Sequence, residues 1–295
     1  MSLGEELRQL LGREVVADDA ETLSAHAGDK WFAHEEPEVV VYAQSTGQVS
    51  ALLEFANDRK IPVTARGAGF GYVGGCVPVR RGIAVSFTRM NRIKEINFAD
   101  AIAVVEPGVI TGHLQSEVRK QHLFYPPDPA SLNDCTLGGN VATNAGGPRC
   151  LKYGVTRNYV AGLEVVLASG EVLKTGGRVH KNKTGFDLVG LFVGSEGMLG
   201  LVTEITVRLI PHPPARATLS AAFETMAEAA TTVQEIFARG FLPSSLEIAD
   251  HFTLEAARRD RGNAVVPEGN AHLLLDVDGQ PETVRGEIEL LRSLV

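Results

Sequence analysis

The distribution of glycine constrains this chain more than any other feature of its sequence. The 295 residues include 31 glycines, which gather in four stretches, at residues 67–75, 138–147, 170–177 and 194–200. Because glycine has no side chain, its backbone adopts positive φ angles and approaches neighbouring groups closely. Clusters of this kind predict loops whose main chain comes close to a ligand.

The segments between the glycine clusters carry the spacing of helices and strands. Leu3, Leu7 and Leu11 lie at helical spacing, and a second helix is expected to begin at Ser45. A hairpin is expected at Ser169-Gly170. Short apolar runs bounded by turn residues predict strands at 62–66, 83–87, 93–97, 102–106, 163–168, 171–174 and 201–210.

A proline-rich connector, Pro211-His-Pro-Pro214, separates this part from the rest of the chain. Prolines at this density do not fit a central strand and form a stiff connection. The pattern beyond it predicts a small antiparallel sheet with helices on one face. The last helix reaches Val295 with no cap, glycine or polar tail, so we expect a truncated domain. Its strands and helices alternate at 217–223, 226–239, 245–249, 252–259, 271–277 and 282–294.

The first glycine cluster, Arg66-Gly-Ala-Gly-Phe-Gly-Tyr-Val-Gly-Gly75, directly follows a predicted strand. In a Rossmann fold, a helix follows the glycines and presents its N-terminus to a pyrophosphate. Here Val73–Pro78 is rich in β-branched residues and contains proline, so no helix is expected. The loop has the character of an anion-binding nest of backbone amides, with a tight connector between two strands as the alternative.

Two further segments suit the wall of a polar ligand site. Tyr125-Pro-Pro-Asp-Pro-Ala-Ser131 has a backbone fixed by its prolines, although a rigid surface loop explains it equally well. Thr136–Gly147 combines short polar side chains with four glycines and has little apolar volume to bury. A third segment, Gly194–Glu204, runs from glycines into a long predicted strand.

Composition limits the class of protein. The net charge of −8 argues against a nucleic-acid partner, which needs a basic face. The chain has no run of 18 apolar residues and no signal-peptide core, which predicts a cytoplasmic protein with no transmembrane segment. Cys76, Cys135 and Cys150 lack metal-ligand spacing and are expected to be reduced thiols, so no metal site is predicted.

The order of these motifs resembles the FAD-linked oxidase family, to which vanillyl-alcohol oxidase and p-cresol methylhydroxylase belong. Within that family, the chain is most similar to the FAD-binding subunit of glycolate oxidase and to the D-lactate dehydrogenase group. The matching blocks are the first glycine loop, Y-P-P-D-P at 125–129, T-x-G-G-N-x-A-T-N-A-G-G at 136–147, K-Y-G-V-T-R at 152–157, and L-F-V-G-S-E-G-x-L-G-x-V-T-E at 191–204.

The resemblance implies an α+β fold. A two-subdomain FAD-binding domain of the p-cresol methylhydroxylase type would be followed by an incomplete ferredoxin-like cap domain. We expect an N-terminal helical segment at 1–33 and the FAD-binding domain at 34–212, with its subdomains split near 100–108. The start of the cap, or substrate, domain is expected at 213–295.

The resemblance also implies which residues hold FAD. The first loop would bind the pyrophosphate through its amides: Arg66, Gly67, Ala68, Gly69, Phe70 and Gly71. A second set would line the flavin and ribityl chain: Pro127, Asp128, Thr136, Gly139, Asn140, Thr143, Asn144 and Gly146. A third would contact the adenosine end or nearby backbone: Glu196, Gly197, Gly200 and Val202. Some relatives attach FAD to a histidine in the first loop; residues 66–75 contain none, so FAD is predicted to bind non-covalently.

By the same resemblance, the chain oxidises a small 2-hydroxy acid, glycolate or D-lactate, to the 2-oxo acid. Hydride passes to flavin N5, and electrons move on to a separate acceptor such as an iron–sulfur partner subunit. The three cysteines here cannot hold such a cluster. That partner would also provide any peripheral attachment to a membrane. Lys152, Tyr153 and Arg157 are candidates for the substrate mouth, with surface charges and a packed tyrosine as the alternative.

The catalytic residues are not assigned from the sequence. Full-length relatives carry a histidine-rich segment near the C-terminus, whereas His212, His251 and His272 are spread singly. One alternative is an FAD-binding module that is inactive without a partner or a missing segment. Another is an FAD oxidoreductase of the same fold that acts on a different alcohol or a sugar-derived substrate.

Overall fold

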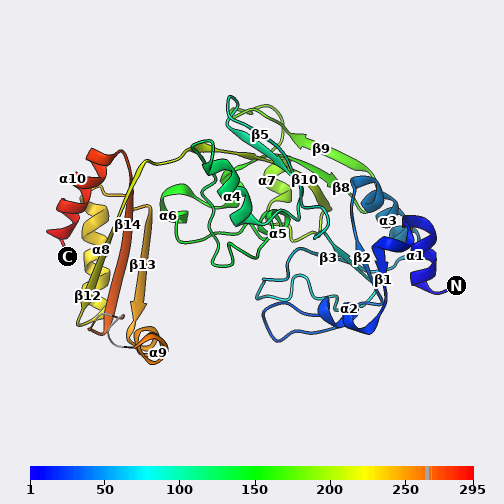
Figure 1. Ribbon diagram of the computed structural model, residues 1–295, viewed down its shortest axis with the longest axis horizontal. Coiled ribbons are helices and arrows are strands. Elements are labelled where there is room, and N and C mark those ends of the chain that lie inside the picture. The colour runs from blue at the N-terminus through cyan, green and yellow to red at the C-terminus, as the bar shows by residue number, and fades with distance from the viewer. Residues whose placement is uncertain (263–265, 267) are drawn as a thin grey trace. The chain divides into compact units, whose positions relative to one another are not determined.

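The computed structural model describes residues 1–262, 266 and 268–295 and has a mixed α and β architecture (Figure 1). The chain forms two compact units. The first comprises Met1–Ala145 and Val155–Ile210, and the second comprises Gly146–Gly154 and Pro211–Val295. The second unit therefore includes a short segment taken from the middle of the first.

The first unit begins with a four-stranded sheet in the order β1-β2-β4-β3. Its central strand β4 pairs in parallel with β2 and β3, while β1 pairs antiparallel with β2. Every residue of β4 is buried, as expected for a parallel strand covered on both faces. The strands are β1 (Val16–Ala17), β2 (Val39–Tyr42), β3 (Val63–Arg66) and β4 (Ile83–Ser86).

Helices α1 (Leu3–Leu11) and α3 (Thr46–Arg59) complete the core of this sheet, and α2 (Ala20–Ala25) lies between them in sequence. Leu7 of α1 and Leu52 of α3 are fully buried in one apolar cluster with the strands. The helical segment at the N-terminus thus contributes to the same core as the first sheet. Helix α3 begins after Ser45, whose hydroxyl accepts from the amide of Gln48 at 3.3 Å.

A five-stranded antiparallel sheet follows, in the order β5-β6-β10-β8-β9. The chain passes from the first sheet to the second between Ser86 and Ile93, because β5 and β6 pair with the second sheet. The subdomain split near 100–108 stays a prediction. Strands β8 and β9 form the predicted hairpin. The strands are β5 (Ile93–Asn97), β6 (Ile102–Val105), β8 (Val160–Val166), β9 (Val172–Gly176) and β10 (Leu201–Arg208).

Short elements fill the connections of this second sheet. Helix α5 occupies most of the second glycine cluster, a segment that was expected to form the wall of a polar ligand site and was assigned no helix from the sequence. The first glycine loop has no helix after it, as predicted. The connecting elements are α4 (Thr111–Arg119), β7 (Leu123–Phe124), α5 (Leu137–Thr143), α7 (Leu188–Phe192) and β11 (Ile210–Pro211), which pairs with β7.

The second unit contains a three-stranded antiparallel sheet in the order β12-β14-β13. Helices α8 and α10 pack on one face, where Ile236, Leu275 and Ile288 share an apolar core (Figure 1). Thr225 and Glu228 form a capping box at the start of α8. The elements are α6 (Cys150–Tyr153), β12 (Ala215–Phe223), α8 (Met226–Ala238), β13 (Ser245–Asp250), α9 (His251–Arg261), β14 (Ala271–Gly279) and α10 (Pro281–Arg292).

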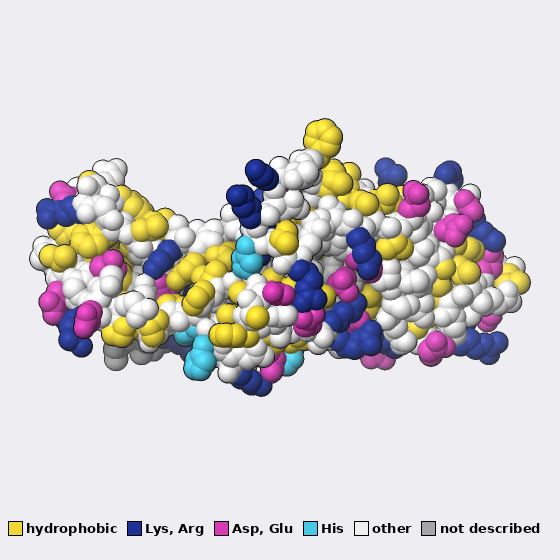
Figure 2. Space-filling view, turned by 90° about the horizontal axis from the view of Figure 1, so that it is seen from above, with side chains coloured by type: hydrophobic (Ala, Val, Ile, Leu, Met, Phe, Trp, Pro, Cys, Tyr) yellow, Lys and Arg dark blue, Asp and Glu magenta, His cyan; other side chains and the backbone are white. Residues whose placement is uncertain are grey.

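Acidic and basic side chains are interspersed on the face that Figure 2 shows. Among the described residues, no helix combines the length and the apolar character that crossing a bilayer requires.

Candidate cofactor site

A cavity of about 680 Å³ lies within the first unit. Three segments that are far apart in sequence supply most of its wall. They are the loop after β3 at residues 65–76, the region around α5 at 129–145, and the approach to β10 at 192–202. Three of the four glycine clusters therefore meet around one cavity.

The first glycine loop offers backbone donors to this cavity. Within the described chain, the amides of residues 67–71 donate no hydrogen bond to a protein acceptor. The loop lines the cavity, and Gly69 has a φ of 75°, which favours glycine. Successive unsatisfied amides form an anion-binding concavity, so this loop fits a diphosphate group without help from a helix N-terminus.

Arg66 shapes the loop and is already committed to protein groups. Its guanidinium donates from Nη1 to the carbonyl of Gly28 at 2.5 Å and from Nη2 to that of Ala25 at 3.3 Å. Nη1 also donates to Sγ of Cys76 at 3.4 Å. Burial raises the pKa of the Cys76 thiol, although the Arg66 charge opposes this. The guanidinium of Arg66 therefore ties the start of the loop to the segment at residues 25–28 and to Cys76.

Helix α5 forms the second wall. The hydroxyl of Thr136 caps the helix by accepting from the amide of Gly139 at 3.3 Å. Asn140 is buried and donates from Nδ2 to Oγ1 of Thr111 at 2.6 Å. A Cβ on Gly67 would lie 2.4 Å from Oγ1 of Thr136, so the first glycine loop and the start of α5 are in direct contact.

The third wall is fixed against the other two. The amide of Glu196 donates to the carbonyl of Ala142 at 2.9 Å, and that of Gly194 donates to Val141 at 2.9 Å. A Cβ on Gly75 of the first loop would lie 3.3 Å from Oε2 of Glu196. Backbone hydrogen bonds thus join the second and third glycine clusters, and the first lies close to side chains of both.

Most of the predicted cofactor residues line this cavity, and four do not. The four are Pro127, Asp128, Asn144 and Gly146, whose contact with cofactor stays a prediction. Gln115 donates from Nε2 to the carbonyl of Pro127 at 2.8 Å, which turns that carbonyl toward the protein core. The lining residues from the prediction are Arg66, Gly67, Ala68, Gly69, Phe70, Gly71, Thr136, Gly139, Asn140, Thr143, Glu196, Gly197, Gly200 and Val202.

Several lining residues had no signal in the sequence. Lys30 comes from a segment before β2, and Phe87 and Pro107 come from turns beside the two sheets. Only tertiary contacts bring these residues to the cavity. For Phe192 and Leu201, the neighbouring glycine cluster was the available clue.

The residues considered for a substrate mouth have protein partners. Lys152 and Tyr153 both contact Asp278 of β14 within the second unit, with Nζ of Lys152 2.6 Å from Oδ1. Arg157 donates to the carbonyls of Gly190 at 2.6 Å and Val193 at 2.7 Å. Their role toward a substrate stays a prediction.

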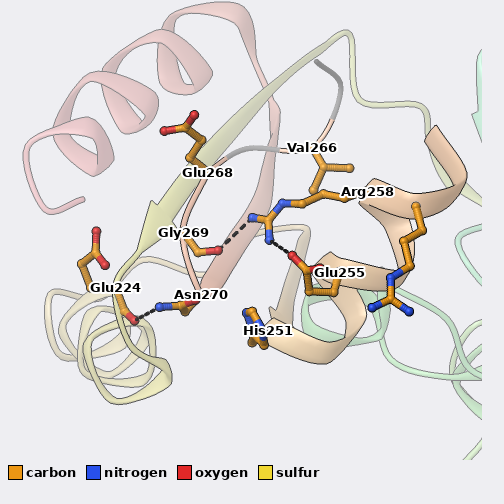
Figure 3. A pocket seen from close by; sticks show the side chains of 9 residues that line it. Glu224, His251, Glu255, Arg258, Val266, Glu268, Gly269 and Asn270 are labelled. Carbon is orange, nitrogen blue, oxygen red and sulfur yellow. Dashed lines mark hydrogen bonds and ion pairs between the residues drawn. The ribbon is translucent and has the colours of Figure 1, made fainter. Parts of the chain in front are cut away.

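A second pocket, of about 590 Å³, lies in the second unit near α9 (Figure 3). Arg258 donates to Oε1 of Glu255 at 2.9 Å and to the carbonyl of Gly269 at 2.8 Å. Charges of both signs offset each other across this pocket, and none of the predicted site residues lies there. The described residues of the chain contain no cluster of His, Cys, Asp or Glu side chains suited to a metal ion.

The fold and the glycine-lined cavity define a flavin-binding protein. Residues 37–176 match the family described as FAD binding domain, and residues 212–295 match the family described as FAD linked oxidases, C-terminal domain. The chain belongs to the FAD-linked oxidases, which confirms the family that the motifs predicted, and its cofactor is FAD.

Two relatives show how similar the sequence is to individual members of the family. Glycolate oxidase subunit GlcD of Bacillus subtilis is 42% identical over 88% of this chain and 55% of its own length. D-lactate dehydrogenase of Anaerostipes hadrus is 38% identical over 92% of this chain and 58% of its own. The chain thus spans somewhat more than half the length of these relatives.

Solved structures confirm the fold. p-Cresol methylhydroxylase with substrate bound superimposes with a TM-score of 0.82 at 23% identity, covering 98% of this chain and 62% of that chain. An alkyldihydroxyacetonephosphate synthase superimposes with a TM-score of 0.83 at 20% identity, over 98% and 58%. At this identity the likeness concerns the fold alone, and the ferredoxin-like character of the cap domain stays a prediction.

Proposed function

We propose that this chain is the FAD-binding part of an enzyme that oxidises a small 2-hydroxy acid, glycolate or D-lactate, to the 2-oxo acid. The observation that carries the proposal is the meeting of three glycine clusters around one cavity, with the unsatisfied amides of residues 67–71 in its wall. Relatives named glycolate oxidase subunit and D-lactate dehydrogenase support the choice of substrate class.

FAD binds non-covalently in this proposal. The described cavity wall contains no histidine, the residue that would tether flavin in the first loop. Its two cysteines are poor nucleophiles as placed. Burial raises the pKa of Cys76, which favours the unreactive thiol, and Cys135 is buried with Sγ donating to Oγ1 of Thr111 at 3.4 Å.

The chain's own residues bind and orient the cofactor. When bound, FAD supplies the acceptor for the hydride that leaves the α-carbon of the substrate. The amides of residues 67–71 hold the diphosphate, and the buried hydrogen bond between Asn140 and Thr111 keeps α5 in place beside it. Preorganised donors of this kind need no rearrangement when the ligand arrives.

The electrons pass to a separate acceptor in this proposal, with a partner subunit as the favoured carrier. The relative from Bacillus subtilis is named as a subunit, which supports a multi-subunit enzyme. Cys76, Cys135 and Cys150 are too few to ligate an iron–sulfur cluster within residues 1–295, which favours a cluster carried by a partner. We place the protein in the cytoplasm, with any membrane attachment supplied by the partner.

An FAD-binding module without turnover is the second candidate. The chain covers 55% of the first relative, so groups needed for turnover can lie in the uncovered part. A substrate other than a 2-hydroxy acid is the third candidate.

The test is the visible spectrum of the purified chain after addition of FAD, recorded before and after anaerobic glycolate, D-lactate or L-lactate. We expect flavin absorbance that bleaches with glycolate or D-lactate and not with L-lactate. Flavin absorbance that none of these acids bleaches would reduce the chain to a binding module. Bleaching only by another alcohol would reassign the substrate, and a protein that never retains FAD would overturn the proposal.

A further inference from the structure

A segment that precedes the matched FAD binding domain is built into the wall of the cavity. The match to the FAD binding domain family begins at residue 37, yet Asp29 and Lys30 form hydrogen bonds with the first glycine loop. Oδ2 of Asp29 accepts from the amide of Gly74 at 2.7 Å, and the amide of Lys30 donates to the carbonyl of Gly71 at 3.0 Å. These two hydrogen bonds fix the position of Lys30 relative to the loop.

The side chain of Lys30 lies at the rim of the cavity, and its Nζ is 4.4 Å from the centre of the Phe70 ring. Among the described residues, no carboxylate lies within ion-pair distance of this ammonium group. The other cationic side chain of the cavity wall, Arg66, donates to Gly28 and Ala25. Lys30 is therefore the cation of the described wall that is not engaged by an anionic or carbonyl group of the protein.

A diphosphate carries more negative charge than the partial charges of backbone amides offset, so a nearby cation would strengthen its binding. The wall also contains the carboxylates of Asp134 and Glu196, which oppose an anionic ligand. Amides supply partial charges only, and a lysine ammonium acts as a mobile point charge beside phosphate.

We propose that Lys30 is a cofactor-binding residue whose ammonium group neutralises the diphosphate of FAD at the first glycine loop. The proposal rests on FAD as the cofactor and is independent of the substrate that the enzyme oxidises. The alternative is a purely structural role, in which Lys30 only positions the Phe70 ring through a cation–π contact.

Salt dependence separates the two roles, because an ion pair with a diphosphate is screened by salt. FAD affinity of the apo-chain is measured by flavin fluorescence at about 0.1 M and about 1 M salt. The variants are Lys30→Met, Lys30→Arg and Phe70→Leu, with Lys120→Met as control. Lys120 is an exposed lysine paired with Glu117 on α4, so its replacement makes the same change in net charge away from the cavity.

We expect Lys30→Met to weaken FAD binding about tenfold at the lower salt concentration and to flatten its salt dependence, as loss of one charge-assisted contact predicts. Lys30→Arg, Phe70→Leu and Lys120→Met should keep the wild-type salt dependence. The inference would be overturned if Lys30→Met kept the wild-type salt dependence of FAD binding. It would also be overturned if Phe70→Leu lost that salt dependence. Failure of the wild-type chain to bind FAD would instead contradict the cofactor site itself.

Discussion

At the scale of single residues, the cavity depends on how closely the first glycine loop approaches α5. Gly67 faces Oγ1 of Thr136, and an added Cβ would lie 2.4 Å from that oxygen. The same oxygen caps α5 by accepting from the amide of Gly139. A methyl group at residue 67 therefore requires either the loop or the Thr136 side chain that caps α5 to move.

Replacement of Gly67 by alanine is expected to weaken FAD binding at least about tenfold, which corresponds to about 1.4 kcal/mol. Fluorescence titration of the apo-variant measures the loss. Gly47→Ala is the matched control, because a Cβ there meets nothing within 4 Å and the residue lies in α3. The control should bind FAD normally and gain up to about 1 kcal/mol of stability. Equal binding by Gly67→Ala and wild type would show that the loop shifts without cost.

The sequence could predict the cavity residues that lie in recognisable motifs, but not those that only tertiary contacts bring to the cavity. Gly69, with its positive φ, belongs to a glycine cluster that is visible in the sequence. The role of Lys30 could not be read from the sequence in this way, because the hydrogen bond from its amide to Gly71 joins residues 41 positions apart and depends on the fold. Pro127 was predicted from its motif, yet the hydrogen bond from Gln115 to its carbonyl could not be inferred from sequence.

At the scale of elements, α5 shows where sequence reasoning fell short. Gly138 and Gly139 lower helix propensity, and no helix was assigned to the segment Thr136–Gly147 from the sequence. The cap by Thr136 and the close packing of Gly138 allow the helix to form. A Cβ on Gly138 would lie 2.6 Å from Cβ of Pro107, so glycine is what lets this helix pack there. By contrast, β3 to β6 and β8 to β10 follow apolar runs that were visible in the sequence.

The middle strand β14 of the second unit carries a buried carboxylate, Asp276, whose hydrogen bonds tie the three strands together. It accepts from Nη2 of Arg216 at 2.5 Å and Oγ1 of Thr218 at 2.5 Å on β12, and from Oγ of Ser245 at 2.8 Å on β13. Burial by itself raises the pKa of Asp276, but these hydrogen bonds outweigh burial and hold the pKa below its ordinary value.

Because the folded-state pKa of Asp276 is depressed, its contribution to stability is present above the ordinary carboxyl pKa of about 3.9 and is lost as the pH falls through the lower folded value. Asp276→Asn is expected to destabilise the second unit by about 1–3 kcal/mol at pH 7. Melting curves between neutral and strongly acidic pH should show this difference shrinking below about pH 4.

Glu235→Gln serves as the control for that series. Glu235 of α8 and Arg239, which caps the end of that helix, form an exposed ion pair, so the change should leave the melting temperature unaltered. A difference between Asp276→Asn and wild type that stays constant across the whole pH range would contradict the assigned role of the carboxylate.

At the scale of the whole molecule, the chain interleaves its two units. Gly146–Gly154 belongs by its contacts to the second unit, while Ala145 and Val155 on either side belong to the first. Lys152 and Tyr153 anchor this segment to Asp278 through hydrogen bonds of 2.6 and 2.9 Å. A boundary read from the prolines at 211–214 could not reveal this, because the anchoring partner lies about 125 residues further along the chain.

The location of the cavity sets how FAD acts on stability. Every described residue of its wall belongs to the first unit, so the ligand stabilises that unit directly. Free FAD at about 100 times its Kd should add about 2.7 kcal/mol to the free energy of unfolding of the unit that binds it.

Calorimetry of the apo-chain is expected to show two unfolding transitions, and FAD is expected to raise the temperature of only one of them. Asp276→Asn identifies the other, because it should lower the transition of the second unit and leave the FAD-sensitive one in place. If calorimetry shows a single transition whose temperature rises with FAD, the two units unfold together and the expectation of independent unfolding is wrong.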